Sequence, residues 1–135
     1  MKDIYSKDGV VQTLVEENII HVTWQELLDA DVLYASCNAQ LEEVKKGAKV
    51  VIIDVSQAKG LPPQEVQDWF GNTLFPGFSA NEHFKGIINI LPSSAIAKLG
   101  ANRWNKTADQ GPFNFSTYET DSVEAAKKLA QELAG

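Results

Sequence analysis

The chain has 135 residues, of which 44% are hydrophobic and 22% charged, and its formal net charge is −6. This length suits one domain spanning residues 1–135, with a core that needs neither a metal nor a disulfide. The acidic balance argues against nucleic acid or an anionic membrane surface as the main partner. Cys37 is the single cysteine, which excludes an intramolecular disulfide. No leader-like start and no apolar run near ~20 residues occur, so we expect a cytoplasmic protein that is not integral to a membrane.

The first elements are two β-rich runs, residues 10–15 and 19–24, which flank a short polar turn and predict a hairpin. The first run reads as an amphipathic edge strand. Residues 29–46 then predict a helix, which Asp29 or Asp31 caps and which Gly47 follows as a stop. Its buried stripe repeats at near-helical spacing and consists of Leu33, Cys37, Leu41 and Val44.

A buried central strand is predicted over residues 49–55, because its middle is an unbroken apolar run typical of parallel sheets. A loop over residues 56–62 follows. Pro63 suits the first turn of the next helix, where its missing N–H costs nothing. We expect residues 75–78, which include Pro76 and Gly77, to break that helix.

The remaining elements continue the alternation. Residues 85–91 predict a second buried strand, and a third helix follows Pro92. Residues 113–118 predict the last strand, and the capping-box spacing of Asp121 and Glu124 predicts the start of a final helix. The order β-β-α-β-α-β-α-β-α indicates an α/β fold with a mainly parallel five-stranded sheet, an antiparallel amino-terminal edge strand and four helices.

Three side chains, at the end of the first buried strand and in the loop after it, are candidates for catalysis. Asp54 stands where a response-regulator receiver carries its phosphoaccepting aspartate, but no acidic pair is placed to hold Mg²⁺, so we interpret it as a helix-facing or loop-bonding carboxylate. Ser56 and Lys59 resemble a nucleophile and a base, but nothing orients them and no G-x-S-x-G motif is present. We therefore interpret the Ser56 hydroxyl as a partner of the loop backbone.

Metal and cofactor sites have little support in the sequence. His21, His83 and Cys37 lack further ligands at workable spacing, so we predict no metal site. No G-x-x-x-x-G-K-[ST] or G-x-G-x-x-G motif is present, and we predict no cofactor. The helix start after Gly60, together with Lys59, leaves open the attraction of an anionic group.

A group of aromatic residues leaves two interpretations open. Its members are Trp69, Phe70, Phe75, Phe78, Phe84 and Trp104. Most are expected in the core. Phe75, Phe78 and Phe84 lie in a segment containing Gly and Pro, and their exposure would mark a partner surface or an apolar-ligand pocket. Residues 102–106, which surround Trp104, read as an ordinary helix terminus with cations near its carboxyl end.

Four stretches together resemble a known family. They are IIHVTW, VVIIDVS, IINIL followed by SSAIAKLGANRW, and FNFSTYETDSVEAAKKLAQEL. The pattern is similar to the SpoIIAA-like fold of sulfate-transporter and anti-sigma-factor-antagonist (STAS) domains, and in particular to small bacterial STAS/SEC14-like proteins. In the phospho-switchable members Asp-Ser-Ser opens the helix after this strand, whereas Pro62, Pro63 and Gln64 match that place here. The resemblance therefore implies a STAS-like module without the phosphoaccepting serine.

We predict a non-enzymatic protein-interaction module, since loops at the carboxyl ends of buried strands are where partners and ligands usually meet α/β proteins. Its expected surface is Ser56, Lys59, Gly60, Leu61, Pro62 and Pro63, and the expected partner is another protein or a second copy of the chain in a homodimer. The alternative, which the SEC14-like resemblance implies, is a small apolar-ligand or lipid-binding protein that uses Phe75, Phe78 and Phe84 as a lid. An enzyme ranks last because no nucleophile, base and orienting group converge.

Overall fold

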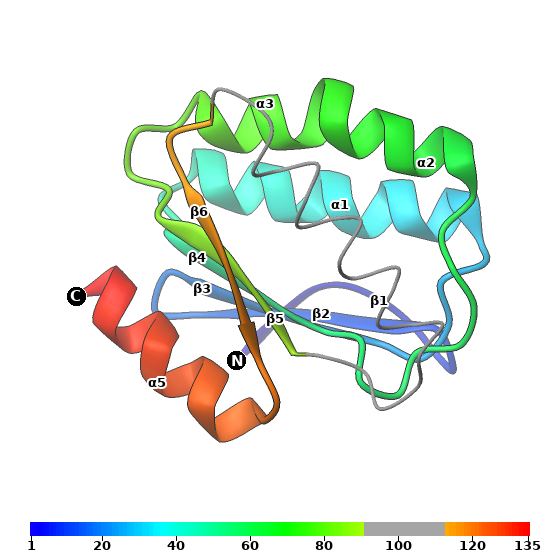
Figure 1. Cartoon of the computed structure of the whole chain (residues 1–135), viewed down its shortest axis with the longest axis horizontal. Helices are drawn as coiled ribbons and strands as arrows, with labels where there is room; N and C mark the ends of the chain where they lie inside the picture. Colours follow the sequence, from blue (N-terminus) through cyan, green and yellow to red (C-terminus); the bar gives the residue numbers. More distant parts are fainter. Residues whose placement is uncertain (91–112) are drawn as a thin grey trace.

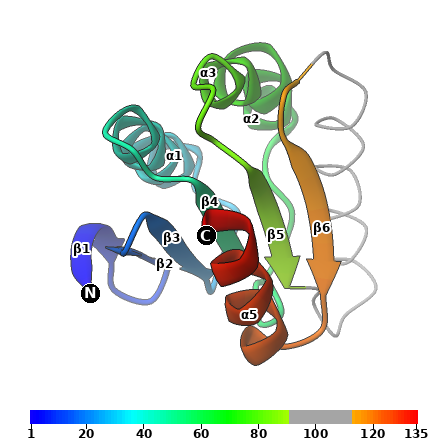
Figure 2. The same cartoon turned by 90° about the vertical axis from the view of Figure 1, so that its left-hand side faces the viewer.

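The computed structural model describes residues 1–90 and 113–135. These residues form one six-stranded sheet with helices on both faces (Figure 1; Figure 2). The strands are β1 (Lys2–Lys7), β2 (Val11–Glu16), β3 (Ile19–Trp24), β4 (Val50–Asp54), β5 (Gly86–Ile90) and β6 (Ser116–Thr120). The helices are α1 (Ala30–Lys45), α2 (Gln64–Trp69), the π-helical turn η1 (Phe70–Leu74), α3 (Phe75–Ser79) and α5 (Val123–Ala134). The predicted α/β class is confirmed.

The sheet has six strands, so the prediction of five was wrong. β1 pairs antiparallel with β2 and takes the edge position that we had assigned to the run at residues 10–15. The sequence of β1, KDIYSK, does not predict a strand. Four of its residues are exposed, and a bulge between Asp3 and Tyr5 disturbs the alternation of apolar and polar residues. Charges and a bulge are also what protects an edge strand from pairing with another chain.

The strands lie side by side in the order in which the chain visits them, from β1 to β6. β1, β2 and β3 are antiparallel, whereas β3, β4, β5 and β6 are parallel. Ligand crevices of open α/β sheets form where the strand order reverses. The described strands contain no such reversal, so the loop after β4 does not border a crevice of that kind.

Each face of the sheet has its own apolar core. α1 and the α2–α3 segment cover one face, and α5 covers part of the other (Figure 2). The large core lies under α1 to α3 and includes Trp24, Leu33, Val51 and Phe78. The smaller core under α5 consists of Ile19, Val50, Ile52, Ile88, Ile90, Ala126 and Ala130.

The expected helix break at residues 75–78 was wrong. The helical path continues from α2 through η1 into α3, which ends at Ser79. In the π-helical turn the N–H of Phe75 donates to the carbonyl of Phe70, five residues earlier. This wider turn precedes Pro76, which has no N–H to give to a regular ladder. The π-turn therefore carries the helix into the proline-containing segment instead of ending it.

The other boundaries differ in detail from those expected. The cap of α1 is Asp29, one of the two residues predicted for this role, and its Oδ1 accepts from the N–H of Val32. The cap of α5 is Ser122 and not Asp121, because the Ser122 Oγ accepts from Ala125 N. β6 begins at Ser116, three residues later than expected. The helix predicted after Pro92, residues 102–106 and Trp104 lie outside the described residues.

Candidate functional site

The end of β4 is closed by the side chain of Asp54. Its Oδ1 accepts from the backbone N–H of Ser56 at 2.9 Å and from the Ser56 hydroxyl at 2.6 Å. The loop-bonding role predicted for Asp54 is confirmed. Ser56 bonds this carboxylate and not a backbone group, so its predicted partner was wrong. The two bonds hold both side chains within the turn.

The loop after β4 is fixed to the segment that follows β3. Lys59 N donates to the Gln25 carbonyl at 3.1 Å, and Leu27 N donates to the Lys59 carbonyl at 2.9 Å. These bonds form a short parallel bridge that continues the β3–β4 pairing beyond the strands. Gly60 has a φ of +78°, and a Cβ atom at that position would lie 2.4 Å from Leu28 Cδ2. The positive φ therefore favours glycine at this position, and any larger residue would also displace the Leu28 side chain.

We call the outward residues of these two joined segments the paired-tail surface: Gln25, Leu28, Gln57, Lys59 and Leu61. Leu28 is 58% exposed, and Gln25, Gln57 and Lys59 are exposed as well. Leu61 is half-buried. The surface thus combines two leucines, two amides and one cation.

The remaining predicted loop residues lie differently. Ser56, Gly60 and Pro63 are half-buried, whereas Pro62 is buried and its carbonyl accepts from Gln67 Nε2 at 2.8 Å. Leu28 was not predicted, although the Leu-Leu pair before α1 is visible in the sequence. Leu27 is buried and Leu28 is exposed. Two adjacent leucines do not reveal which one faces water.

Phe75, Phe78 and Phe84 are core residues, which are 4%, 1% and 1% exposed. The ring centroids of Phe78 and Phe84 are 4.9 Å apart, and Phe84 also contacts Phe115 at 5.1 Å. Of the two interpretations that the sequence left open, the structure supports burial in the core and not exposure at a surface. Phe75 and Phe78 belong to α3, and Phe84 directly precedes β5. Figure 1 shows α3 and the start of β5 at the opposite end of the sheet from the loop after β4. The structure therefore separates the predicted site residues into two groups.

An apolar cavity lies beside these aromatic residues. Its volume is about 10 Å³, and its lining includes Phe75, Phe78, Trp24, Cys37 and Gln40. A space of this size holds about one water molecule and no lipid chain. Burial also raises the pKa of the Cys37 thiol to about 12, so this group stays protonated at neutral pH.

The two histidines lie on different elements. His21 is half-buried on β3, and its pKa is lowered first by burial and then by the charge of Lys127, while Glu16 opposes this shift. His83 contacts the carbonyl of Val44 through Nε2. Within residues 1–90 and 113–135, no three His, Cys, Asp or Glu residues are grouped to hold a metal ion.

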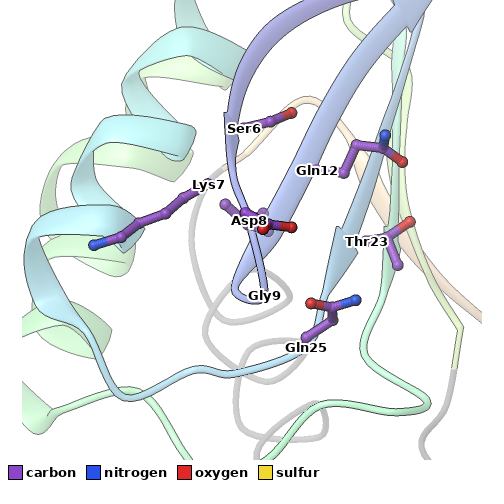
Figure 3. Close-up of a pocket in the computed structure, with 8 residues that line it drawn as sticks. Ser6, Lys7, Asp8, Gly9, Gln12, Thr23 and Gln25 are labelled. Carbon is purple, nitrogen blue, oxygen red and sulfur yellow. The ribbon is translucent and has the colours of Figure 1, made fainter.

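A polar cavity lies beside the turn between β1 and β2, and we call it the hairpin cavity. Its volume is about 340 Å³. It is lined by Ser6, Lys7, Asp8, Gly9, Val11, Gln12, Thr23 and Gln25 (Figure 3). Three of these residues occupy one cross-strand row, in which Ser6 pairs with Gln12 and Gln12 with Thr23. The sequence could not indicate this cavity, because the strand that forms one wall was not predicted.

The hairpin cavity and the paired-tail surface meet at Gln25. Its backbone N–H donates to the Val10 carbonyl at 2.8 Å, and its own carbonyl accepts from Lys59. One residue therefore links the β1–β2 turn to the loop after β4. Both features lie near the carboxyl ends of β3 and β4, and two backbone hydrogen bonds hold them together.

Comparison of the chain with protein-family models, with curated proteins and with solved structures finds no match. None of the described helices is long and apolar enough to cross a membrane.

Proposed function

We propose that the chain is a non-enzymatic, STAS-like protein-interaction module of the bacterial cytoplasm, and that it binds its partner through the paired-tail surface. The observation that carries this proposal is the exposure of Leu28, at 58%, on a backbone that hydrogen bonds hold in place. The resemblance of the sequence to STAS domains supports the class of module.

Rigidity favours binding at the paired-tail surface. The bonds from Lys59 to Gln25 and from Leu27 to Lys59 order the backbone before any partner arrives. Binding therefore costs little additional loop entropy. The mixture of exposed and half-buried leucines with amides and a cation also suits the composition of a small protein interface.

The start of α2 supports a module that phosphorylation does not switch. By the sequence resemblance, Pro62, Pro63 and Gln64 match the place where the phospho-switchable STAS domains carry their serine, and none of the three has a hydroxyl group. Pro63 makes no side-chain capping bond to α2. The nearby Ser56 hydroxyl donates to Asp54. We therefore infer constitutive recognition, with an unlike protein or a second copy of the chain as the partner.

Affinity capture from a bacterial lysate tests the proposal, with Leu28→Asp, Lys59→Glu and Gly60→Arg as the variants. Each should lose a partner that the unaltered chain captures, because each changes the charge or shape of the paired-tail surface. Lys128→Glu, an exposed charge reversal on α5, is the matched control and should retain the partner. Equal capture by all four variants would remove the paired-tail surface as the binding site. Light scattering of the purified chain separates self-association from binding of an unlike protein.

The apolar-ligand alternative has less support, because the described cavity beside Phe75 and Phe78 has a volume of only about 10 Å³. Native mass spectrometry of the purified chain, followed by organic extraction, tests this alternative directly. A stoichiometric apolar molecule that copurifies with the chain would favour it over a protein-interaction module.

A further inference from the structure

We propose that the hairpin cavity binds a small, uncharged, polyhydroxylated molecule of the sugar class. This site is additional to the paired-tail surface, and the inference does not rest on the proposed protein interaction. It follows from the size, the charge and the hydrogen-bonding groups of the hairpin cavity.

The hairpin cavity has a defined shape because three strands and a fixed turn build it. Val10 N donates to the Lys7 carbonyl at 3.0 Å and closes the turn, in which Gly9 has a φ of +76°. The bond from Gln25 N to the Val10 carbonyl fixes the far side of the turn to the end of β3. The volume of about 340 Å³ is at the lower end of the range for small-molecule sites, which suits one or two sugar rings.

The charge of the lining argues against an anionic ligand. Lys7 contributes to the wall, but its side chain points away toward α1, where its Nζ is 3.7 Å from Asp29 Oδ2 (Figure 3). Asp8 is the other charged residue in the lining and faces the cavity side of the turn. Among the described residues of the lining, a phosphate or carboxylate would therefore meet a like charge and no free cation.

The remaining polar side chains match the hydroxyl groups of a sugar. Gln12 and Gln25 each offer an amide that donates and accepts, and Thr23 offers a hydroxyl that does both. None of these three side chains is hydrogen-bonded to another described residue. The Asp8 carboxylate adds an acceptor. A sugar hydroxyl both donates and accepts hydrogen bonds. An apolar ligand would displace the water bound to these groups and leave their hydrogen bonds unreplaced.

A titration of the ¹⁵N-labelled chain with maltose and with glucose, followed by NMR, tests the proposal. We expect saturable shifts of the backbone amides of Gln12, Thr23 and Gln25, and no such shifts with inorganic phosphate. Gln12→Ala and Thr23→Val should each weaken maltose binding by roughly twofold to tenfold, the effect of one lost hydrogen bond. Both positions are exposed and lie outside the paired-tail surface, so protein capture should continue in these variants.

Asn38→Ala, an exposed amide on α1, is the matched control and should bind maltose like the unaltered chain. Absence of saturable shifts with both sugars would overturn the proposal. Undiminished maltose binding in the Gln12→Ala/Thr23→Val double variant would overturn the assignment of the site. Tighter binding of phosphate than of either sugar would overturn the ligand class.

Discussion

The two faces of the sheet differ in how completely helices cover them. α1 and the α2–α3 segment form a broad layer over one face, whereas α5 packs on β4 and β5 and leaves much of β1, β2 and β3 open on the other (Figure 2). The hairpin cavity borders this open part. One face of the sheet thus supplies most of the apolar core, and the other combines a small core with an accessible polar surface.

The composition of the strands explains this difference. Ile20, Val22 and Trp24 of β3 face the α1 side and are at most 1% exposed. On the other side His21 is half-buried and Thr23 is exposed. β4, in contrast, is apolar on both faces until its last residue. α5 therefore covers the strands that present apolar residues to it and stops where the face becomes polar.

Polar contacts also differ between the faces. On the α1 side, Thr13 Oγ1 and Ser36 Oγ are 2.8 Å apart, and Gln40 Nε2 donates to the same Ser36 oxygen at 3.2 Å. This buried network joins α1 to β2, and loss of one member would leave the others unsatisfied. On the other face, Lys49 Nζ donates to the carbonyl of Ala134 at 3.2 Å and holds the end of α5 against the sheet. That bond is only partly buried and costs less to break.

The largest expected difference comes from a matched pair of leucine truncations. Leu33→Ala, in α1 at 0% exposure, should lower the free energy of unfolding by about 3 kcal/mol, because it leaves a cavity in the large core. Leu129→Ala, in α5 and half-buried, should lower it by about 1 kcal/mol. Urea denaturation measures both values, and equal losses would show that α5 contributes as much to the core as α1 does.

A smaller effect is expected at the start of α5. Ser122→Ala removes the oxygen that accepts from Ala125 N and should cost about 1 kcal/mol in the free energy of unfolding. Amide hydrogen exchange should show that this loss makes the α5 amides exchange faster while those of α1 change little. Asp121→Ala is the control and should leave exchange in α5 nearly unaltered. If Asp121→Ala speeds amide exchange in α5 more than Ser122→Ala does, then Asp121 and not Ser122 is the cap.

The smallest expected effect is a pH dependence of the free energy of unfolding, which arises from His21 on the α5 side of the sheet. The pKa of His21 in the folded chain is below its ordinary value of 6.5, so the unfolded chain takes up the proton more readily. Stability should therefore fall as the pH is lowered through 6.5 toward the folded pKa. Below the folded pKa, the contribution of His21 to the pH dependence of stability levels off.

Urea unfolding at a series of pH values checks this contribution, with His21→Gln as the comparison because it cannot titrate. Lys127→Gln should narrow the pH range over which stability falls, because the Lys127 charge is one of the causes that lower the pKa of His21. Identical pH profiles for the unaltered chain and for His21→Gln would contradict the assignment to His21.

Much of the fold was predictable because the signals for its elements are local. The unbroken apolar runs of β4 and β5, the cap at Asp29 and the stripe of α1 all depend on neighbours within a few residues. The candidate site was predictable only in part. Asp54 was correctly assigned to the loop, whereas the exposure of Leu28 and the burial of Phe75 depend on distant segments.

The sequence by itself determined the alternation of strands and helices from the first hairpin to β5 and the final pair of β6 and α5, since the period of apolar residues is a property of the chain alone. The tertiary structure decided which surfaces remain open. β1 became a strand through its backbone bonds to β2, although its own residues carry almost no strand pattern. The hairpin cavity then formed because β1, β2 and β3 bring Ser6, Gln12 and Thr23 into one row. The register of these hairpins follows from their turns and from which face is buried, so the row could not be assigned without β1 as a strand.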